Sequence, residues 1–270
     1  MKEIALIILI GLVISCKKDM NDIPSYISID NISLSSNTTE NITDAWVYID
    51  DNLQGVYELP ANFPVLALGK HKLRVKAGIK DNGIAGTRIT YPFFTSYIIE
   101  EQEFNATETI SIFPEVDYLE NTNFFIENFE SSGIKLEETS ISDTLIIQIQ
   151  DYNNKYASGV LTDSLITFEV VTTEQFSDIP QEGAPVYLEL DYKCNTRFLV
   201  GMYVNFPSAV LQKDLLWINP KENWNKIYIN LTPTVSESVG ADNFKIFITM
   251  KRDFILDTNM IYFDNLKLVY

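Results

Sequence analysis

Cysteine and histidine are scarce in this chain. Its 270 residues include two cysteines, Cys16 and Cys194, and one histidine, His71. This leaves too few ligands for a Cys/His zinc site, and a Ser–His–Asp or Cys–His catalytic arrangement would have to use His71. The sequence also lacks the Gly-x-Ser-x-Gly turn that exposes a catalytic serine. We therefore predict that the chain is not an acyl-transfer enzyme.

Positive charge is scarce as well. The chain has 20 Lys and Arg against 37 Asp and Glu, which gives a formal net charge of −17. Such an excess repels any polyphosphate, and no glycine-rich phosphate loop leads from a strand into a helix, so we expect no nucleic-acid or nucleotide partner. With 46% hydrophobic residues, the chain can bury a large core, and this excludes wholesale disorder.

The uncharged run Ile4–Ile14 has only eleven residues, fewer than the roughly 20 of a membrane-spanning helix. It has the length of a signal peptide. Val13-Ile14-Ser15-Cys16 resembles the bacterial lipobox, and the resemblance implies cleavage before Cys16 and lipid attachment to its thiol. Several acyl chains hold a folded domain stably on a bilayer. An ordinary signal peptide with an incidental cysteine is the alternative.

The resemblance implies a lipoprotein of the bacterial outer membrane, with a signal peptide at 1–15 and a lipidated tether at 16–24. The stretch Lys17–Asp22 is partly similar to the lysine-plus-acid export signal of surface lipoproteins in Bacteroidetes, but Met20 stands where a second acid is usual. Whether the folded part faces the periplasm or the cell surface therefore stays open.

Beyond the tether, no 3.6-residue apolar periodicity persists over a helix length, whereas period-two runs of Val, Ile, Tyr, Phe and Thr recur between turn residues. The sequence predicts an all-β chain of two β-sandwich domains. A strand that ends at Pro114, followed by an acidic polar stretch, predicts a boundary between domains at 25–118 and 119–270. The clearest predicted strands are 45–49, 71–77, 109–113, 145–150, 165–172, 186–194, 198–205, 226–231, 244–250 and 260–269.

The first domain contains Ala45–Asp51, Gly55, Leu59-Pro60 and Leu68–Val75 in that order. This order resembles the PEGA-type β-sandwich module and implies a spacer or adhesion role; a generic immunoglobulin-like sandwich is the alternative. Gly69 would supply a tight turn, with Leu73 and Val75 on the inward face. On such a strand we expect His71 to be a hydrogen-bonded structural residue.

The second domain contains Asn128–Gly133, Tyr156–Leu161, Trp224–Leu231 and Ile261–Leu268. This succession is similar to the galactose-binding-like jelly rolls that include many carbohydrate-binding modules. The resemblance implies that Glu130 and Asp264 could share a structural calcium ion, with carbonyl groups and waters completing the shell. The alternative is that Asp264 only binds backbone groups at a strand crossing.

Strand alternation separates the candidate ligand-binding side chains from the core. Trp217 lies opposite Leu216 and Ile218, and Tyr203 lies opposite Met202 and Val204. On the strand that begins at Val186, Cys194 is predicted to lie on the core face. Trp224, on another strand, is also predicted to be a core residue. If the outward faces coincide, one concave glycan-binding surface would hold Trp217, Tyr203, Tyr187, Glu189 and Asp191.

These observations favour a non-catalytic, lipid-anchored envelope protein whose jelly roll binds a glycan or a protein partner. A purely structural scaffold of an envelope assembly is the second hypothesis. A glycan-processing enzyme is the third, because 37 acids leave room for a catalytic carboxylate pair.

Overall fold

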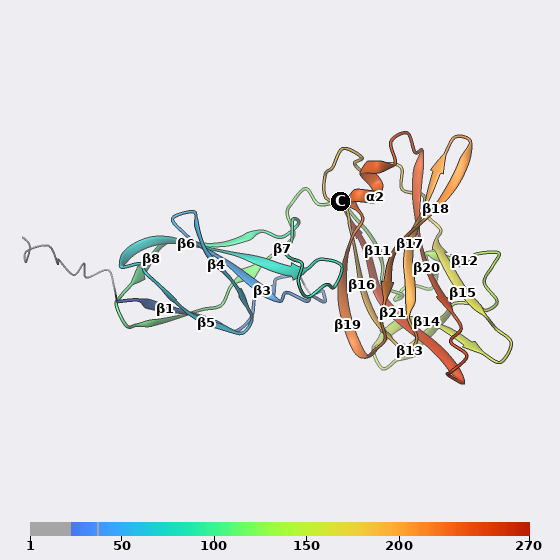
Figure 1. Ribbon diagram of the computed structural model, residues 1–270, viewed down its shortest axis with the longest axis horizontal. Helices are drawn as coiled ribbons and strands as arrows, with labels where there is room; N and C mark the ends of the chain where they lie inside the picture. The colour runs from blue at the N-terminus through green and yellow to red at the C-terminus, as the bar shows by residue number, and fades with distance from the viewer. Residues whose placement is uncertain (1–22, 37) are drawn as a thin grey trace, which may run out of the picture. The chain divides into compact units, whose positions relative to one another are not determined.

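The computed structural model describes residues 23–36 and 38–270 (Figure 1). The predicted signal peptide, Cys16 and all but two residues of the predicted tether lie outside these ranges. Within them, no helix is both long and apolar enough to cross a membrane.

The described residues confirm the all-β prediction. Strands dominate, and the short helix α2 (Thr232–Glu237) is the only helix among these residues. All ten predicted strands overlap an observed strand, because period-two alternation marks strands that bury one face.

The chain divides into two compact units. The smaller one comprises residues up to Ser33, Asp44–Ala77 and Ser96–Val116. The larger one comprises Asp117–Tyr270 together with two segments from earlier in the chain, Leu34–Thr43 and Gly78–Thr95. The larger unit thus includes residues on both sides of the predicted boundary.

The smaller unit contains a three-stranded sheet in the order β5-β1-β9, in which β1 and β9 run parallel. A second sheet has the order β4-β3-β6-β7, with β8 paired to β6, and β10 pairs with β2. The end of this sheet where Gly78–Lys80 of β6 pair with β7 belongs to the larger unit. The bounds are β1 Ser25–Ile29, β2 Ser33–Leu34, β3 Asp44–Ile49, β4 Asn52–Glu58, β5 Ala61–Val65, β6 Gly69–Lys80, β7 Arg88–Thr90, β8 Ser96–Phe104, β9 Thr109–Ile112 and β10 Glu115–Val116.

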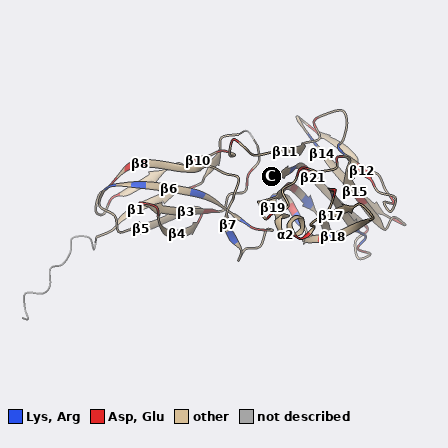
Figure 2. Cartoon of the chain, turned by 90° about the horizontal axis from the view of Figure 1, so that it is seen from above, with Lys and Arg blue, Asp and Glu red and all other residues tan. Residues whose placement is uncertain are grey.

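Strand β6 has the alternation predicted for it. Leu73 and Val75 are fully buried, and Gly69 has a φ of 84°, which favours glycine. Lys and Arg recur along β6 and Glu recurs along the neighbouring β8, as the blue and red stretches in Figure 2 show. Lys70 and Glu101 form one ion pair between them, 2.8 Å long and exposed.

The larger unit is a sandwich of two antiparallel sheets (Figure 1). The six-stranded sheet has the order β13-β14-β21-β16-β19 with β11 beside β21, and the five-stranded sheet has the order β12-β15-β20-β17-β18. The bounds are β11 Phe124–Glu127, β12 Leu136–Glu138, β13 Ile147–Asp151, β14 Asn154–Thr162, β15 Thr167–Thr172, β16 Tyr187–Cys194, β17 Phe198–Phe206, β18 Ala209–Ile218, β19 Lys221–Asn230, β20 Asn243–Lys251 and β21 Thr258–Val269.

A single apolar core fills the space between these two sheets. Leu188 and Leu190 from the six-stranded sheet pack in the same cluster as Val200 and Met202 from the five-stranded sheet. Each sheet therefore also has an outward face that points away from this core, and these two faces carry the polar and aromatic residues that the sequence analysis singled out.

Candidate functional site

The outward face of the five-stranded sheet carries a second, smaller apolar cluster made by Val171, Leu199 and Phe247 with the half-buried Tyr203. Glycine is required at position 201, because a Cβ there would come within 2.2 Å of the Phe247 ring. Tyr203 alternates with the core residues Met202 and Val204 on β17, and this alternation places it on the outward face, as predicted.

The hydroxyl of Tyr203 forms a hydrogen bond within the protein. It donates a hydrogen bond of 2.8 Å to Oε1 of Glu169, and its ring lies 4.8 Å from that of Phe247. Burial, together with Glu169, raises the pKa of Tyr203. Its hydroxyl therefore stays protonated at neutral pH, and the side chain offers a fixed ring surface rather than a reactive group.

Trp217 lies on the same outward face, opposite Leu199 in the pairing of β17 with β18. Its side chain is 47% exposed, whereas its neighbour Ile218 is 3% exposed and belongs to the core. The guanidinium of Arg197 lies 5.0 Å from the centre of the Trp217 ring. This cation–π contact fixes the ring orientation while part of the ring remains open to solvent.

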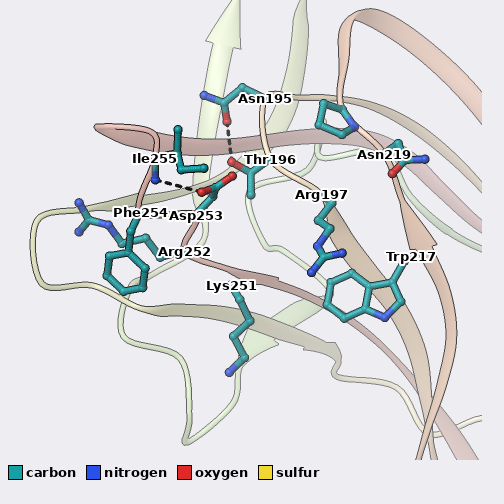
Figure 3. A pocket seen from close by; sticks show the side chains of 11 residues that line it. Asn195, Thr196, Arg197, Trp217, Asn219, Lys251, Arg252, Asp253, Phe254 and Ile255 are labelled. Atoms are coloured by element: carbon teal, nitrogen blue, oxygen red, sulfur yellow. Dashed lines mark hydrogen bonds between the residues drawn. The ribbon is translucent and has the colours of Figure 1, made fainter.

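A pocket of about 590 Å³ lies beside Trp217, at the end of the five-stranded sheet where β17 begins and β18 and β20 end. Figure 3 shows Arg197 and Trp217 on one side of it and Arg252 and Phe254 on the other. Phe254 is 76% exposed. The pocket therefore combines aromatic surfaces with positively charged side chains.

Tyr187, Glu189 and Asp191 share the outward face of the other sheet, since they alternate with the core residues Leu188 and Leu190 on β16. All three are nevertheless buried, and Glu189 has no exposed surface. They do not line an open surface, and they lie on a different sheet from Trp217 and Tyr203. The five residues therefore do not form the single concave surface that was predicted.

The carboxylate of Glu189 is held by four side chains. Oε2 lies 3.0 Å from Nζ of Lys226 and 3.6 Å from Nζ of Lys267. Oε1 accepts hydrogen bonds of 2.8 Å from the hydroxyls of Tyr91 and Tyr118. Burial by itself raises the pKa of Glu189, but the charges of the two lysines outweigh this effect and lower it, so the carboxylate is ionised at neutral pH.

Asp191 completes this buried cluster. Its Oδ1 lies 3.7 Å from Nζ of Lys226, and its Oδ2 accepts hydrogen bonds from Thr39 (2.6 Å) and Asn265 (2.8 Å). Two carboxylates and two ammonium groups thus compensate one another. Buried charges require such pairing, because an unpaired one costs several kcal/mol.

The residues that cover this cluster come from three segments that we call the collar: 34–43, 78–95 and 117–123. Thr39, Tyr91 and Tyr118 each come from a different one of these segments. The hydroxyl of Tyr187 donates to Asp81 at 3.0 Å, and backbone hydrogen bonds join Asn82 to Tyr228 and Leu119 to Phe93. The collar therefore covers the part of the outward face of the six-stranded sheet that carries Tyr187, Glu189 and Asp191.

The predicted calcium ligands have protein partners. Asp264 accepts hydrogen bonds from Asn154 (3.0 Å) and from the backbone N–H of Asn265 (2.7 Å), and Glu130 accepts the backbone N–H of Lys155 (2.8 Å). In the described part of the chain, no group of three or more His, Cys, Asp or Glu side chains is placed to hold a metal ion. This donor set does not fit a calcium shell without further ligands.

Three further predictions concern single residues. Cys194 is confirmed as a buried member of the core. His71 is hydrogen-bonded as expected, to Asp50 (2.6 Å) and to the carbonyl of Leu68 (3.0 Å). The prediction for Trp224 is wrong: its side chain is 41% exposed and packs edge-on against Tyr156.

Sequence reasoning missed the pocket beside Trp217. Lys251 is the last residue of β20, and Arg252 and Phe254 follow it in the loop before β21. The signal that could have indicated them is the pair Phe254-Ile255, two large apolar residues in a short polar turn, both of which are exposed.

No family model and no curated protein matches the chain. Similar solved structures include the family 30 carbohydrate-binding module of the cellulosomal cellulase Cel9D-Cel44B of Clostridium thermocellum, with 13% identity over 53% of this chain and 96% of that one, and a TM-score of 0.41. A family 29 module shows 11% identity, coverage of 55% and 89%, and a TM-score of 0.36. A ligand for this chain has to be argued from its own side chains.

Replacing Glu189 with Gln is expected to destabilise the larger unit by roughly 3–5 kcal/mol, because it leaves the buried Lys226 and Lys267 without sufficient negative charge. Urea unfolding followed by tryptophan fluorescence measures this change. The matched control is Glu101→Gln, which breaks the exposed pair with Lys70 and should cost less than about 1 kcal/mol. Equal effects of the two substitutions would contradict a structural role for the cluster.

The raised pKa of Asp264 leads us to expect that the stability of the chain depends on pH. Burial, with the nearby charges of Asp191 and Glu130, raises the pKa of Asp264 to about 6 in the folded chain. The folded state therefore holds this proton more tightly than the unfolded state, so the contribution of Asp264 to stability falls as pH rises from about 4 to about 6. Asp264→Asn should remove this loss and gain stability relative to the wild type across that window.

Melting temperatures measured across this pH window in chelator test that expectation. Asp143→Asn is a control of opposite sign: hydrogen bonds from the backbone N–H groups of Ile166 and Thr167 lower the pKa of Asp143, so its titration lies below this window and the variant should lose a nearly constant amount of stability across it. Repeating the series with added calcium tests the predicted metal, since a bound cation lowers the pKa of its carboxylate ligands and raises the melting temperature. A melting temperature that calcium leaves unchanged would remove Glu130 and Asp264 from consideration as ligands.

Proposed function

We propose that this chain is a non-catalytic envelope protein, tethered by lipid at Cys16, whose larger unit binds a glycan on the outward face of the five-stranded sheet. The observation that carries the proposal is Trp217, which is 47% exposed on that face beside a pocket and has its ring held by Arg197. Fixed, half-exposed aromatic rings beside convergent polar groups are typical of sites that bind small molecules.

The spacing of the aromatic residues favours an oligosaccharide over a single sugar. Trp217 pairs with Leu199, and Tyr203 lies four residues further along β17. At about 3.3 Å per residue, the two positions are about 13 Å apart. A ligand that contacts both would extend along the sheet over several sugar rings.

Binding rather than catalysis is supported by the carboxylates near Trp217. Asp253 accepts the backbone N–H of Ile255 (3.0 Å), and Asp214 accepts the side-chain amide of Gln212 (3.1 Å). Of the residues that line the pocket, Asp253 is the only one with a carboxylate. Glycoside hydrolysis requires two carboxylates on either side of the scissile bond, and the pocket does not supply that pair.

Trp217→Ala is expected to weaken oligosaccharide binding by roughly tenfold or more, because it removes the largest exposed ring from the face. Isothermal titration of the full chain with a panel of soluble oligosaccharides measures this loss. Trp224→Ala is the matched control, since Trp224 is similarly exposed (41%) but lies on β19 of the other sheet. If no oligosaccharide binds the wild type and a protein partner co-purifies instead, the result contradicts the glycan proposal and supports the scaffold hypothesis.

Cys16→Ser is expected to release the chain from the membrane fraction, because the serine hydroxyl cannot form the thioether that carries the lipid. Cell fractionation and mass spectrometry of the N-terminal peptide measure the change. Cys194→Ser, which alters only the buried cysteine, should leave the protein in the membrane fraction. An unmodified thiol at Cys16 in the native protein would overturn the anchor.

A further inference from the structure

The pocket beside Trp217 is lined mostly by positive charges, whereas the chain as a whole is negatively charged. Three cationic side chains, Arg197, Lys251 and Arg252, line this pocket, and Asp253 is the only carboxylate among its lining residues. The chain as a whole has 37 acids against 20 basic residues. The pocket is therefore a local concentration of positive charge on an acidic protein.

Among the described residues, no carboxylate lies within ion-pair distance of Arg197 or Arg252, and the charge of Lys251 acts on Asp143 without a direct ion pair. Arg197 contacts the ring of Trp217, and Nζ of Lys251 donates a hydrogen bond of 2.8 Å to the hydroxyl of Thr167. The guanidinium of Arg252 lies 5.5 Å from the ring of Phe254, and its Nε and Nη1 are buried without a hydrogen-bond acceptor. Unmet donors of a buried guanidinium are costly, and an incoming anion would provide acceptors for this group of cations.

Aromatic rings stand beside these charges. Trp217 is 47% exposed and Phe254 is 76% exposed, and Figure 3 shows them on opposite sides of the pocket. A ligand with both an apolar ring face and an anionic group fits this combination: the ring face can stack on Trp217 while Arg252, which has unmet donors, receives the charge. Guanidinium groups match the planar geometry of carboxylate and the oxygens of sulfate.

We propose that the pocket beside Trp217 binds the anionic group of an acidic glycan, either the carboxylate of a uronic acid or a sulfate ester. This inference rests on the proposed function and names the class of sugar that the same face selects. A neutral glycan would leave the cations unpaired, whereas an acidic one pairs them at the end of the aromatic face.

The test compares three hexasaccharides by isothermal titration against the full chain: one of galacturonic acid, one that is sulfated, and neutral cellohexaose. We expect at least one acidic ligand to bind roughly tenfold more tightly than the neutral one, with a preference that falls as salt is added. The galacturonate and sulfate arms decide which anionic group the pocket prefers.

Arg252→Gln is expected to weaken binding of the acidic ligand roughly tenfold and to change binding of cellohexaose by less than about twofold, because Arg252 contacts Phe254 and not the Trp217 ring. Lys213→Gln is the matched control, because it removes the same charge from an exposed position of β18 that does not line the pocket. Lys251→Gln is a second pocket variant that should act in the same direction as Arg252→Gln.

The outcomes separate this inference from the function on which it rests. Equal affinity for acidic and neutral ligands, or an equal loss of both in Arg252→Gln, overturns the acidic preference and leaves glycan binding in place. Inorganic sulfate that competes as well as the sulfated sugar also overturns it, because the sugar then contributes nothing. Absence of binding to all three, and to every other oligosaccharide tried, overturns the proposed function itself.

Discussion

The buried carboxylate of Glu189 is the constraint on which the larger unit depends. It has no exposed surface, yet it is ionised, because Lys226 and Lys267 lie 3.0 and 3.6 Å from it and two tyrosines donate to it. Removing a carboxylate from water costs several kcal/mol unless its partners are in place. The sheet supplies the two lysines and the collar supplies the two tyrosines, so folding of the sheet and docking of the collar are linked through this group.

This constraint makes the two outward faces of the sandwich different. Both faces consist of strand residues that point away from one apolar core. On the six-stranded sheet, Tyr187, Glu189 and Asp191 are satisfied by residues of the same chain, so their hydrogen-bonding capacity is used internally. On the five-stranded sheet, Trp217 stays half exposed beside a pocket. Trp224 on the six-stranded sheet is also exposed, but the exposed ring beside a pocket lined by cations is that of Trp217, on the five-stranded sheet.

Strand alternation made much of this arrangement predictable from sequence. It predicted the outward direction of Trp217 and Tyr203 and the burial of Cys194, because side chains on a strand point to alternate sides. It could not show what lies on an outward face. The groups that cover Glu189 and Asp191 come from Thr39, Tyr91 and Tyr118, which are 71 to 152 residues away in sequence. Polar and aromatic alternation on β16 is equally consistent with a ligand site and with an internal interface, and here it forms the interface.

The same distinction between local and long-range information applies to charge. A net charge of −17 opposes long polyanions, which must approach over a large part of the surface. Charges on the surface are screened beyond about 8–10 Å at physiological ionic strength. A single carboxylate or sulfate that enters the pocket therefore responds to Arg197, Lys251 and Arg252 more than to distant acids. An acidic protein can for this reason exclude nucleic acid and still pair one anionic group of a sugar at a site where its few cations gather beside exposed aromatic rings.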